Sequence, residues 1–197
     1  MDTGKDLHVV IARYLQNDRE NRREVVYIGT RQHYSELDEL MSRYKVGLCV
    51  IDALPELHAA REFAKRHAGN VYLNYFVESQ RGSYNWNSQE HIVQENRTEA
   101  LDASRQAIRE GKVVLPRGGP VIQEFAEHVA ADVKQLVEDR DTGAKSFRYV
   151  RTGVDHYSLA FTYECIAASR YAPIHVHCTG WIAPEGYERE NIMKVVF

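Results

Sequence analysis

Hydrophobic and polar residues are arranged along this chain so that strands are expected first, followed by alternating helices and strands. Residues 7–15 and 24–29 alternate like strands across the charged turn 16–23, which predicts an antiparallel hairpin. Apolar residues spaced three and four apart predict helices over residues 34–44, 55–67, 97–110, 120–138 and 155–170. The remaining expected strands cover residues 46–51, 71–77, 113–115 and 147–150.

This order of elements predicts an α/β protein with a mixed sheet flanked by helices. The chain has 197 residues, of which 44% are hydrophobic, and that is enough for one good core. The helix expected over 120–138 rests on the spacing of Phe125, Val129, Val133 and Leu136. We therefore expect one domain over residues 1–172, followed by a variable tail over residues 173–197.

Asp52 follows the apolar run 46–51, which has the pattern of a buried strand. A carboxylate at the end of such a strand is costly unless a charged or hydrogen-bonding group meets it. Ligands of α/β sheets also gather at the carboxyl ends of strands, so Asp52 is a candidate ligand. Helix capping before Pro55 is the alternative interpretation.

Asp155 stands between the strand-like residues 147–150 and the last expected helix, in its first turn. Leu159, Thr162 and Ile166 mark the face of that helix that packs on the sheet, which places Asp155 at the edge of this face. Taken alone, Asp155 is explained by its favourable position at the positive end of the helix dipole.

Asp2 precedes a glycine turn and the first strand. Chain ends are commonly polar, so this position carries little weight by itself. Its significance depends on the motifs that follow it in the chain.

Four short segments in order resemble the nuclease domain of the large terminase subunit of tailed bacteriophages. They are Asp2–Ile11, Val50–Pro55, Leu115–Pro116 and Gly153–Ala160. The resemblance covers roughly residues 2–170 and implies a ribonuclease H-like fold. It also implies a nuclease that cuts concatemeric viral DNA into genome lengths, in the cytoplasm of the infected host cell.

The resemblance carries metal-binding and catalytic roles onto Asp2, Asp52 and Asp155, which would hold two Mg²⁺ or Mn²⁺ ions. Such a pair of hard cations activates the attacking water and stabilises the departing 3′ oxygen. The implied partners are double-stranded DNA and, in the intact packaging system, the portal and the small terminase subunit. No membrane partner is expected.

Two features depart from the family pattern. Only Met1 precedes Asp2, whereas the family's first strand begins earlier, so we expect a truncated central strand and a loosely held Asp2. The phosphate-binding motif of the packaging ATPase is also missing, because no lysine follows Gly118 and Gly119. We therefore expect an isolated nuclease domain taken from a longer protein.

The formal net charge is −3, which is unlike that of a generic DNA-binding protein. DNA contact would then depend on local basic residues near the acids and on the metal ions. The candidates are Lys5, Arg81, Arg117, Lys145, Arg148 and Arg151. Each of them could equally be an ordinary solvated surface residue.

Cys49, Cys165 and Cys178 do not form the framework of a disulfide-rich protein, and neither a secretion signal nor an apolar membrane span is visible. A reducing cytoplasm fits this cysteine usage. His175, His177 and Cys178 resemble half of a zinc site, but no second ligand cluster accompanies them.

Two other classes of function remain open from the sequence. A resolvase or transposase with a ribonuclease H-like fold would use similar carboxylates on branched or end-specific DNA. A docking domain of the packaging motor would keep the fold without cutting DNA. Fold alone does not separate these classes, whereas convergence of the three acids would.

Overall fold

The computed structural model describes residues 1, 6–16, 18–138, 143–170 and 195–196. The helices are α1 (Tyr34–Arg43), α2 (Leu57–Arg66), α3 (Arg97–Arg109), α4 (Pro120–Ala130) and α5 (His156–Arg170). The strands are β1 (Leu7–Tyr14), β2 (Arg23–Arg31), β3 (Val46–Asp52), β4 (Val71–Phe76), β5 (Asn85–Asn87), β6 (Ile92–Glu95), β7 (Val113–Val114), β8 (Asp132–Glu138), β9 (Lys145–Arg151) and β10 (Val195–Val196).

The main sheet is mixed, with strand order β5-β6-β4-β3-β10-β1-β2-β7. Strands β3, β4 and β6 are parallel to one another, and β1 and β2 form the expected antiparallel hairpin. Strand β10 is parallel to β3 and antiparallel to β1, so β1 and β3 run in opposite directions. The predicted mixed α/β class is therefore confirmed.

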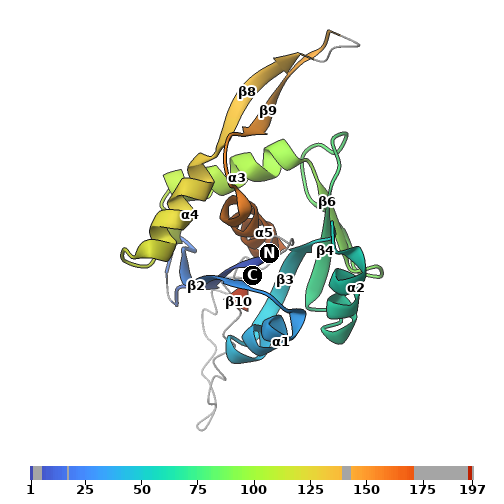
Figure 1. Ribbon diagram of the computed structural model, residues 1–197, viewed down its shortest axis with the longest axis vertical. Coiled ribbons are helices and arrows are strands. Elements are labelled where there is room, and N and C mark those ends of the chain that lie inside the picture. The colour runs from blue at the N-terminus through green and yellow to red at the C-terminus, as the bar shows by residue number, and fades with distance from the viewer. Residues whose placement is uncertain (2–5, 17, 139–142, 171–194, 197) are drawn as a thin grey trace, which may run out of the picture.

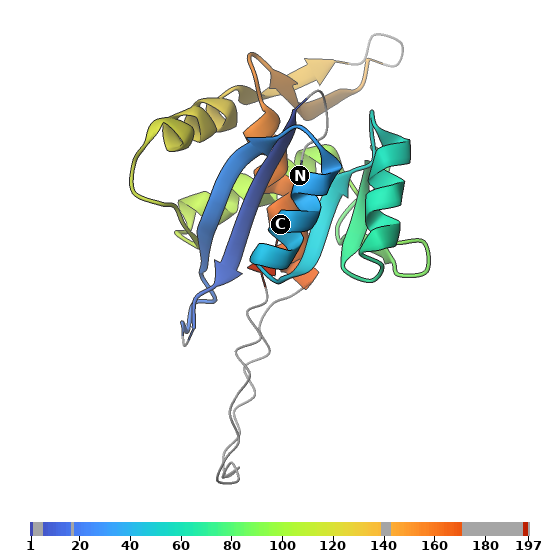
Figure 2. The ribbon, with the colours of Figure 1, turned by 60° about the horizontal axis from the view of Figure 1, so that its bottom comes forward.

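Helices cover both faces of this sheet (Figures 1 and 2). Helices α1 and α2 pack their apolar stripes on one face, against alternate residues of β1, β3 and β4. Helix α5 lies on the other face, against β1 and β3, and α3 and α4 contact α5 in turn. Because it is enclosed between the sheet and two helices, α5 is buried along most of its length.

A buried ion pair ties α5 to the sheet. Arg23 of β2 donates to both carboxylate oxygens of Glu164, at 2.7 and 3.1 Å, and the Glu164 side chain is fully buried. Two parallel hydrogen bonds satisfy the carboxylate that this helix buries.

The expected helices near residues 34–44, 55–67, 97–110 and 155–170 are confirmed within a few residues. Leu37, Leu40 and Met41 form the buried stripe of α1, as the spacing predicted. The short strand near residues 113–115 is present as β7.

The helix expected over residues 120–138 is wrong in its second half. Helix α4 ends at Ala130, and β8 then pairs with β9 as a hairpin that projects from the domain beyond α3 (Figure 1). Val133 and Leu136, which were expected in the core, are 40% and 57% exposed. Their helical spacing was coincidental, because the backbone groups of β8 are paired with β9 instead.

Most of the tail over residues 173–197 lies outside the described residues. Its described part, β10, lies in the sheet between β1 and β3, where it pairs with the end of β1 and with the start of β3. Toward the end of β3, Met1 takes the place beside this strand: its amino group donates to the Val50 carbonyl oxygen, and its carbonyl oxygen accepts from the Asp52 amide.

Candidate functional site

The carboxyl end of the parallel strands and the start of α5 lie at the same end of the sheet. His8, near the start of β1, stacks on His156 in the first turn of α5. Because β1 and β3 run in opposite directions, Asp52 at the end of β3 lies at that same end. The structure therefore places Asp52 and Asp155 at one edge of the sheet, where ligands of such sheets bind.

Asp52 is held from two sides. Its Oδ1 atom accepts from the Leu54 amide at 3.1 Å, and its Oδ2 atom accepts from the Tyr163 hydroxyl of α5 at 2.9 Å. Burial raises the pKa of Asp52 above its usual range, although both hydrogen bonds favour the charged form. The capping alternative is wrong, because α2 begins at Leu57 with Glu56 as its N-cap and the Leu54 amide lies outside the helix. The bond to Tyr163 points the carboxylate toward α5.

Two polar residues beside Asp52 were not predicted from the sequence. Asn74 of β4 is the register neighbour of Asp52, and Glu95 ends the adjacent strand β6. Their side chains are 1% and 2% exposed, and none of their side-chain nitrogen and oxygen atoms forms a hydrogen bond of good geometry among the described residues. Burial raises the pKa of Glu95 to about 8; a weak hydrogen bond from the Asn74 side chain opposes this shift, and the Asp52 charge adds to it.

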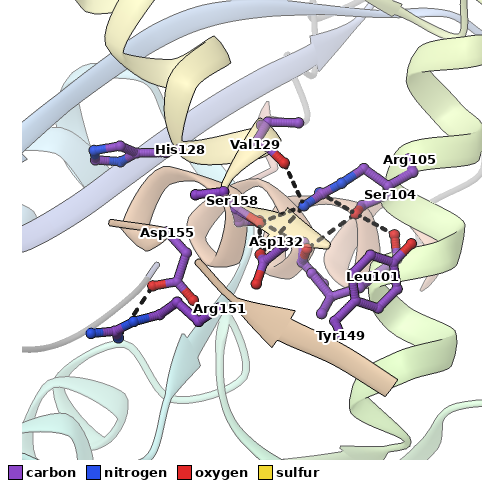
Figure 3. A network of polar contacts seen from close by, with 12 residues as sticks. Leu101, Ser104, Arg105, His128, Val129, Asp132, Tyr149, Arg151, Asp155 and Ser158 are labelled. Carbon is purple, nitrogen blue, oxygen red and sulfur yellow. Dashed lines mark hydrogen bonds and ion pairs between the residues drawn. The ribbon is translucent and has the colours of Figure 1, made fainter. Parts of the chain in front are cut away.

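Asp155 directly precedes α5 and is paired with arginines. Its side chain is only 2% exposed and lies 3.3 Å from Arg151 and 3.7 Å from Arg97. Figure 3 shows the contact with Arg151. Burial, followed by the Asp132 charge, raises the pKa of Asp155, and both arginines oppose this shift.

Asp132, at the start of β8, is the centre of a buried polar network (Figure 3). The Ser158 hydroxyl donates to its Oδ2 atom, and Arg105 lies 3.4 Å from the same oxygen. Arg97 lies 3.4 Å from the other oxygen, so one arginine contacts both Asp132 and Asp155. This network joins the hairpin to α3 and α5, and it was not predicted because Asp132 was assigned to a helix.

Two of the predicted DNA-binding residues come together at a cavity of about 310 Å³. Arg81 and Arg148 line it together with Arg97. Glu78 and Glu99 line it as well, and they pair with Arg148 at 3.0 Å and with Arg81 at 4.0 Å. Arg97 is in turn paired with Asp132 and Asp155, so each of the three guanidinium groups at this cavity has a carboxylate partner.

The other predicted residues are spread more widely. Lys145 pairs with Glu138 on the hairpin, and Arg117 is exposed between β7 and α4. Arg151 is 63% exposed and pairs with Asp155. Asp2 and Lys5 lie outside the described residues, as do the zinc-like candidates His175, His177 and Cys178. Cys49 and Cys165 are buried and free.

A group of three histidines adjoins this end of the sheet. The His8 ring lies 4.5 Å from the His156 ring and 6.0 Å from the His128 ring, measured between centroids. Burial, followed by the His156 charge, lowers the pKa of His8 to about 4. The His8 ring is therefore neutral at pH 7. The contacts among the three rings pack β1 against α4 and α5.

The possible metal ligands of this site are oxygen donors. Within the described ranges, no group of three or more His, Cys, Asp and Glu side chains is arranged to hold a metal ion. Asp52 and Glu95 nevertheless supply carboxylate oxygens, and Asn74 supplies an amide oxygen, at adjacent strand ends. Oxygen donors of this kind fit Mg²⁺ and Mn²⁺, which are hard cations.

The signal for Asn74 and Glu95 was present in part. Asn74 interrupts the apolar strand Val71–Phe76, and a polar residue inside a buried strand calls for a partner. The register that sets Asn74 between Asp52 and β6 is a long-range property, which a single sequence does not reveal.

None of the helices in the described part of the chain is both long and apolar enough to span a membrane. No family model matches the chain, and no curated protein or solved structure matches it either.

Proposed function

We propose that this chain is a divalent-metal-dependent DNA endonuclease with a ribonuclease H-like fold. The observation that carries the proposal is that Asp52, at the carboxyl end of β3, and Asp155, at the start of α5, lie at the same end of the sheet, each with a raised pKa. Carboxyl groups with raised proton affinity at such an edge are typical of sites that bind a cation or exchange a proton.

Asp2, Asp52 and Asp155 are the proposed ligands of two Mg²⁺ or Mn²⁺ ions. Asp2 is included on the resemblance alone, because it lies outside the described residues. When bound, the ions would activate the attacking water and stabilise the departing 3′ oxygen.

Arginines next to the acids supply the proposed contact with the DNA backbone. Arg97 reaches Asp155 and also lines the cavity that Arg81 and Arg148 share. Guanidinium groups bind phosphate oxygens in a fixed geometry, and we assign a backbone phosphate to this cavity, where it would replace Glu99 or Glu78 as the partner of Arg81 or Arg148. Charge of this kind fixes position on DNA and reads no sequence, which agrees with a nuclease of little sequence preference.

The wider context of the proposal comes from the resemblance to terminase nucleases. In that context the substrate is concatemeric viral DNA, and the portal and small terminase subunit restrain cleavage in the host cytoplasm. The topology supports the fold assignment: a hairpin, β1 and β2, is followed by the parallel strands β3, β4 and β6, with helices on both faces.

The test is digestion of supercoiled plasmid in Mn²⁺, Mg²⁺ or chelator. Asp52→Asn and Asp155→Asn keep side-chain shape while removing the charge, and each is expected to abolish metal-dependent nicking without unfolding the chain. Asp38→Asn is the matched control, because Asp38 is an α1 acid that pairs with Arg66 and His67 away from the proposed site.

Full activity of Asp52→Asn or Asp155→Asn would remove that acid from the mechanism. Cutting in the presence of chelator would overturn the metal requirement. Absence of cutting under every condition would favour the non-catalytic docking domain. Cleavage confined to branched DNA would favour a resolvase.

A further inference from the structure

The polar side chains of Asn74 and Glu95 are buried, and apart from a weak contact with each other they form no hydrogen bond among the described residues. A buried carboxyl or amide group without a good hydrogen-bond partner destabilises the folded state. Native structures rarely keep two such groups side by side, so their arrangement calls for a ligand.

Strand register and side-chain direction bring these groups to Asp52. Asp52 and Asn74 are register partners, and Glu95 is the partner of Phe76, two residues further along β4. Val50, Tyr72 and Val93 all pack in the cluster that contains α5. Because side chains alternate along a strand, Asp52, Asn74 and Glu95 point to this same face.

The surroundings favour a cation over an additional hydrogen-bonding side chain. Asp52 is partly exposed, which leaves a route from solvent to the group. The described ion pairs of this chain include neither Asp52 nor Glu95, whereas Asp132 and Asp155 each contact two arginines. Two carboxylates and an amide oxygen without thiolate or imidazole select a hard cation.

We propose that Asp52, Asn74 and Glu95 form an oxygen-ligand site for one Mg²⁺ or Mn²⁺ ion. The choice of cation rests on the proposed function, and the assignment makes Asn74 and Glu95 metal ligands in addition to the three aspartates. Asp52 is then shared between this site and the aspartate set. Bound metal satisfies the Glu95 carboxylate and the Asn74 carbonyl oxygen together.

The competing explanation is a neutral pair in which protonated Glu95 lies against Asn74. In that case the two residues are part of the core and have no effect on metal affinity. The two explanations differ in what Glu95→Gln does, because glutamine mimics the protonated acid in shape and hydrogen bonding.

The experiment is calorimetric titration of Mn²⁺ into the metal-free full chain. Glu95→Gln is expected to weaken Mn²⁺ binding roughly tenfold or more, as loss of a ligand does. Glu62→Gln is the matched control and should bind like the unaltered chain, since Glu62 is an exposed α2 residue paired with Lys65. Circular dichroism of each variant establishes that it is folded.

The melting temperature in the presence of Mn²⁺ is a second measurement, and it compares two variants with the unaltered chain. Saturating Mn²⁺ is expected to raise the melting temperature of the unaltered chain and of Glu62→Gln, because ligands of the native state stabilise it. The rise should be smaller in Glu95→Gln and in Asn74→Leu than in the unaltered chain, because only the proposed aspartate set then binds metal. Equal Mn²⁺ affinity and equal melting shift in Glu95→Gln would overturn the proposal in favour of the neutral pair.

These outcomes are distinguishable from failure of the proposed function. Plasmid cleavage that needs metal, together with unaltered Mn²⁺ binding by Glu95→Gln, would overturn the new site and support the nuclease. Glu95-dependent Mn²⁺ binding by a chain that cuts no DNA would support the site and overturn the nuclease.

Discussion

Two acidic groups at one end of the sheet balance their charge in opposite ways. Asp132 and Asp155 are buried against Arg97, Arg105 and Arg151. Asp52 accepts hydrogen bonds from a hydroxyl and a backbone amide group. Glu95 forms no hydrogen bond of good geometry among the described residues.

The acids paired with arginines have a structural role, and those without arginine partners are available for binding. Arginine neutralisation fixes β8, α3 and α5 relative to one another, which a buried ion-pair network does when its lone pairs are satisfied. Carboxylates without arginine partners keep raised proton affinity and remain available to a cation. Asp155 stands between these tasks, because metal binding there requires Arg97 or Arg151 to give up its contact.

The largest effect is expected from breaking the arginine-balanced group. Asp132→Ala leaves the nearly buried Arg105 without its carboxylate, and we expect a loss of about 3–5 kcal/mol in the free energy of unfolding. Urea denaturation measures this loss.

Asp102→Ala is the control for that substitution, because Asp102 is a 39% exposed acid paired with Lys134. Its loss should be about 1 kcal/mol or less. An Asp132→Ala variant as stable as this control would show that the network does not hold the hairpin to the domain.

Glu95→Gln should change how stability depends on pH. The pKa of Glu95 is raised to about 8 from an ordinary 4.5, so the folded state binds more protons between these values. Metal-free protein therefore loses stability as pH rises from about 4.5 to 8, by up to about 5 kcal/mol.

The substitution removes this loss, so the metal-free variant should be the more stable protein at pH 8 by a few kcal/mol and nearly equal to the unaltered chain at pH 4.5. Subtraction of the two urea-derived pH profiles isolates Glu95 from other groups, including His8. Parallel profiles across this range would contradict the raised pKa.

Tyr163→Phe removes the hydroxyl that donates to Asp52 and leaves the ring in the core. We expect a loss of about 1–2 kcal/mol in unfolding free energy, since the acceptor is a carboxylate. Tyr149→Phe removes a comparable bond to the more exposed Asp102 and should cost less. Equal losses in the two variants would show that burial of Asp52 adds nothing to its hydrogen bond.

Arg151→Ala should have the smallest effect on stability. Arg151 is 63% exposed, and Arg97 remains beside Asp155 after the substitution, so we expect a loss of 1 kcal/mol or less, roughly. Thermal denaturation at low and high salt measures it. A loss above about 2 kcal/mol would mean that Arg151, although exposed, is the main counter-charge of Asp155.

The fold was predictable where one element's own pattern determines it. Leu37, Leu40 and Met41 define α1 from their spacing alone, and the hairpin β1 and β2 follows from its charged turn. The hairpin β8 and β9 was missed because Val133 and Leu136 continue the spacing of α4. Gly143, with φ of +68°, was the available signal for a turn between two strands.

The candidate site was predictable only for residues at element ends. Asp52 and Asp155 stand where the sequence changes from one element to the next, and both are found at the expected edge of the sheet. Asn74 and Glu95 join them through the register of three strands, and Arg97 joins them through the packing of α3 on α5. Such relations depend on tertiary structure, which local patterns do not contain.

Diffraction from crystals soaked in Mn²⁺ tests the central claim most directly, because anomalous scattering locates the ion without reference to activity. The account predicts an anomalous peak at the carboxyl end of β3, with oxygens of Asp52 and Glu95 about 2.0–2.5 Å away. Absence of a peak there at saturating Mn²⁺, with the fold intact, would contradict it.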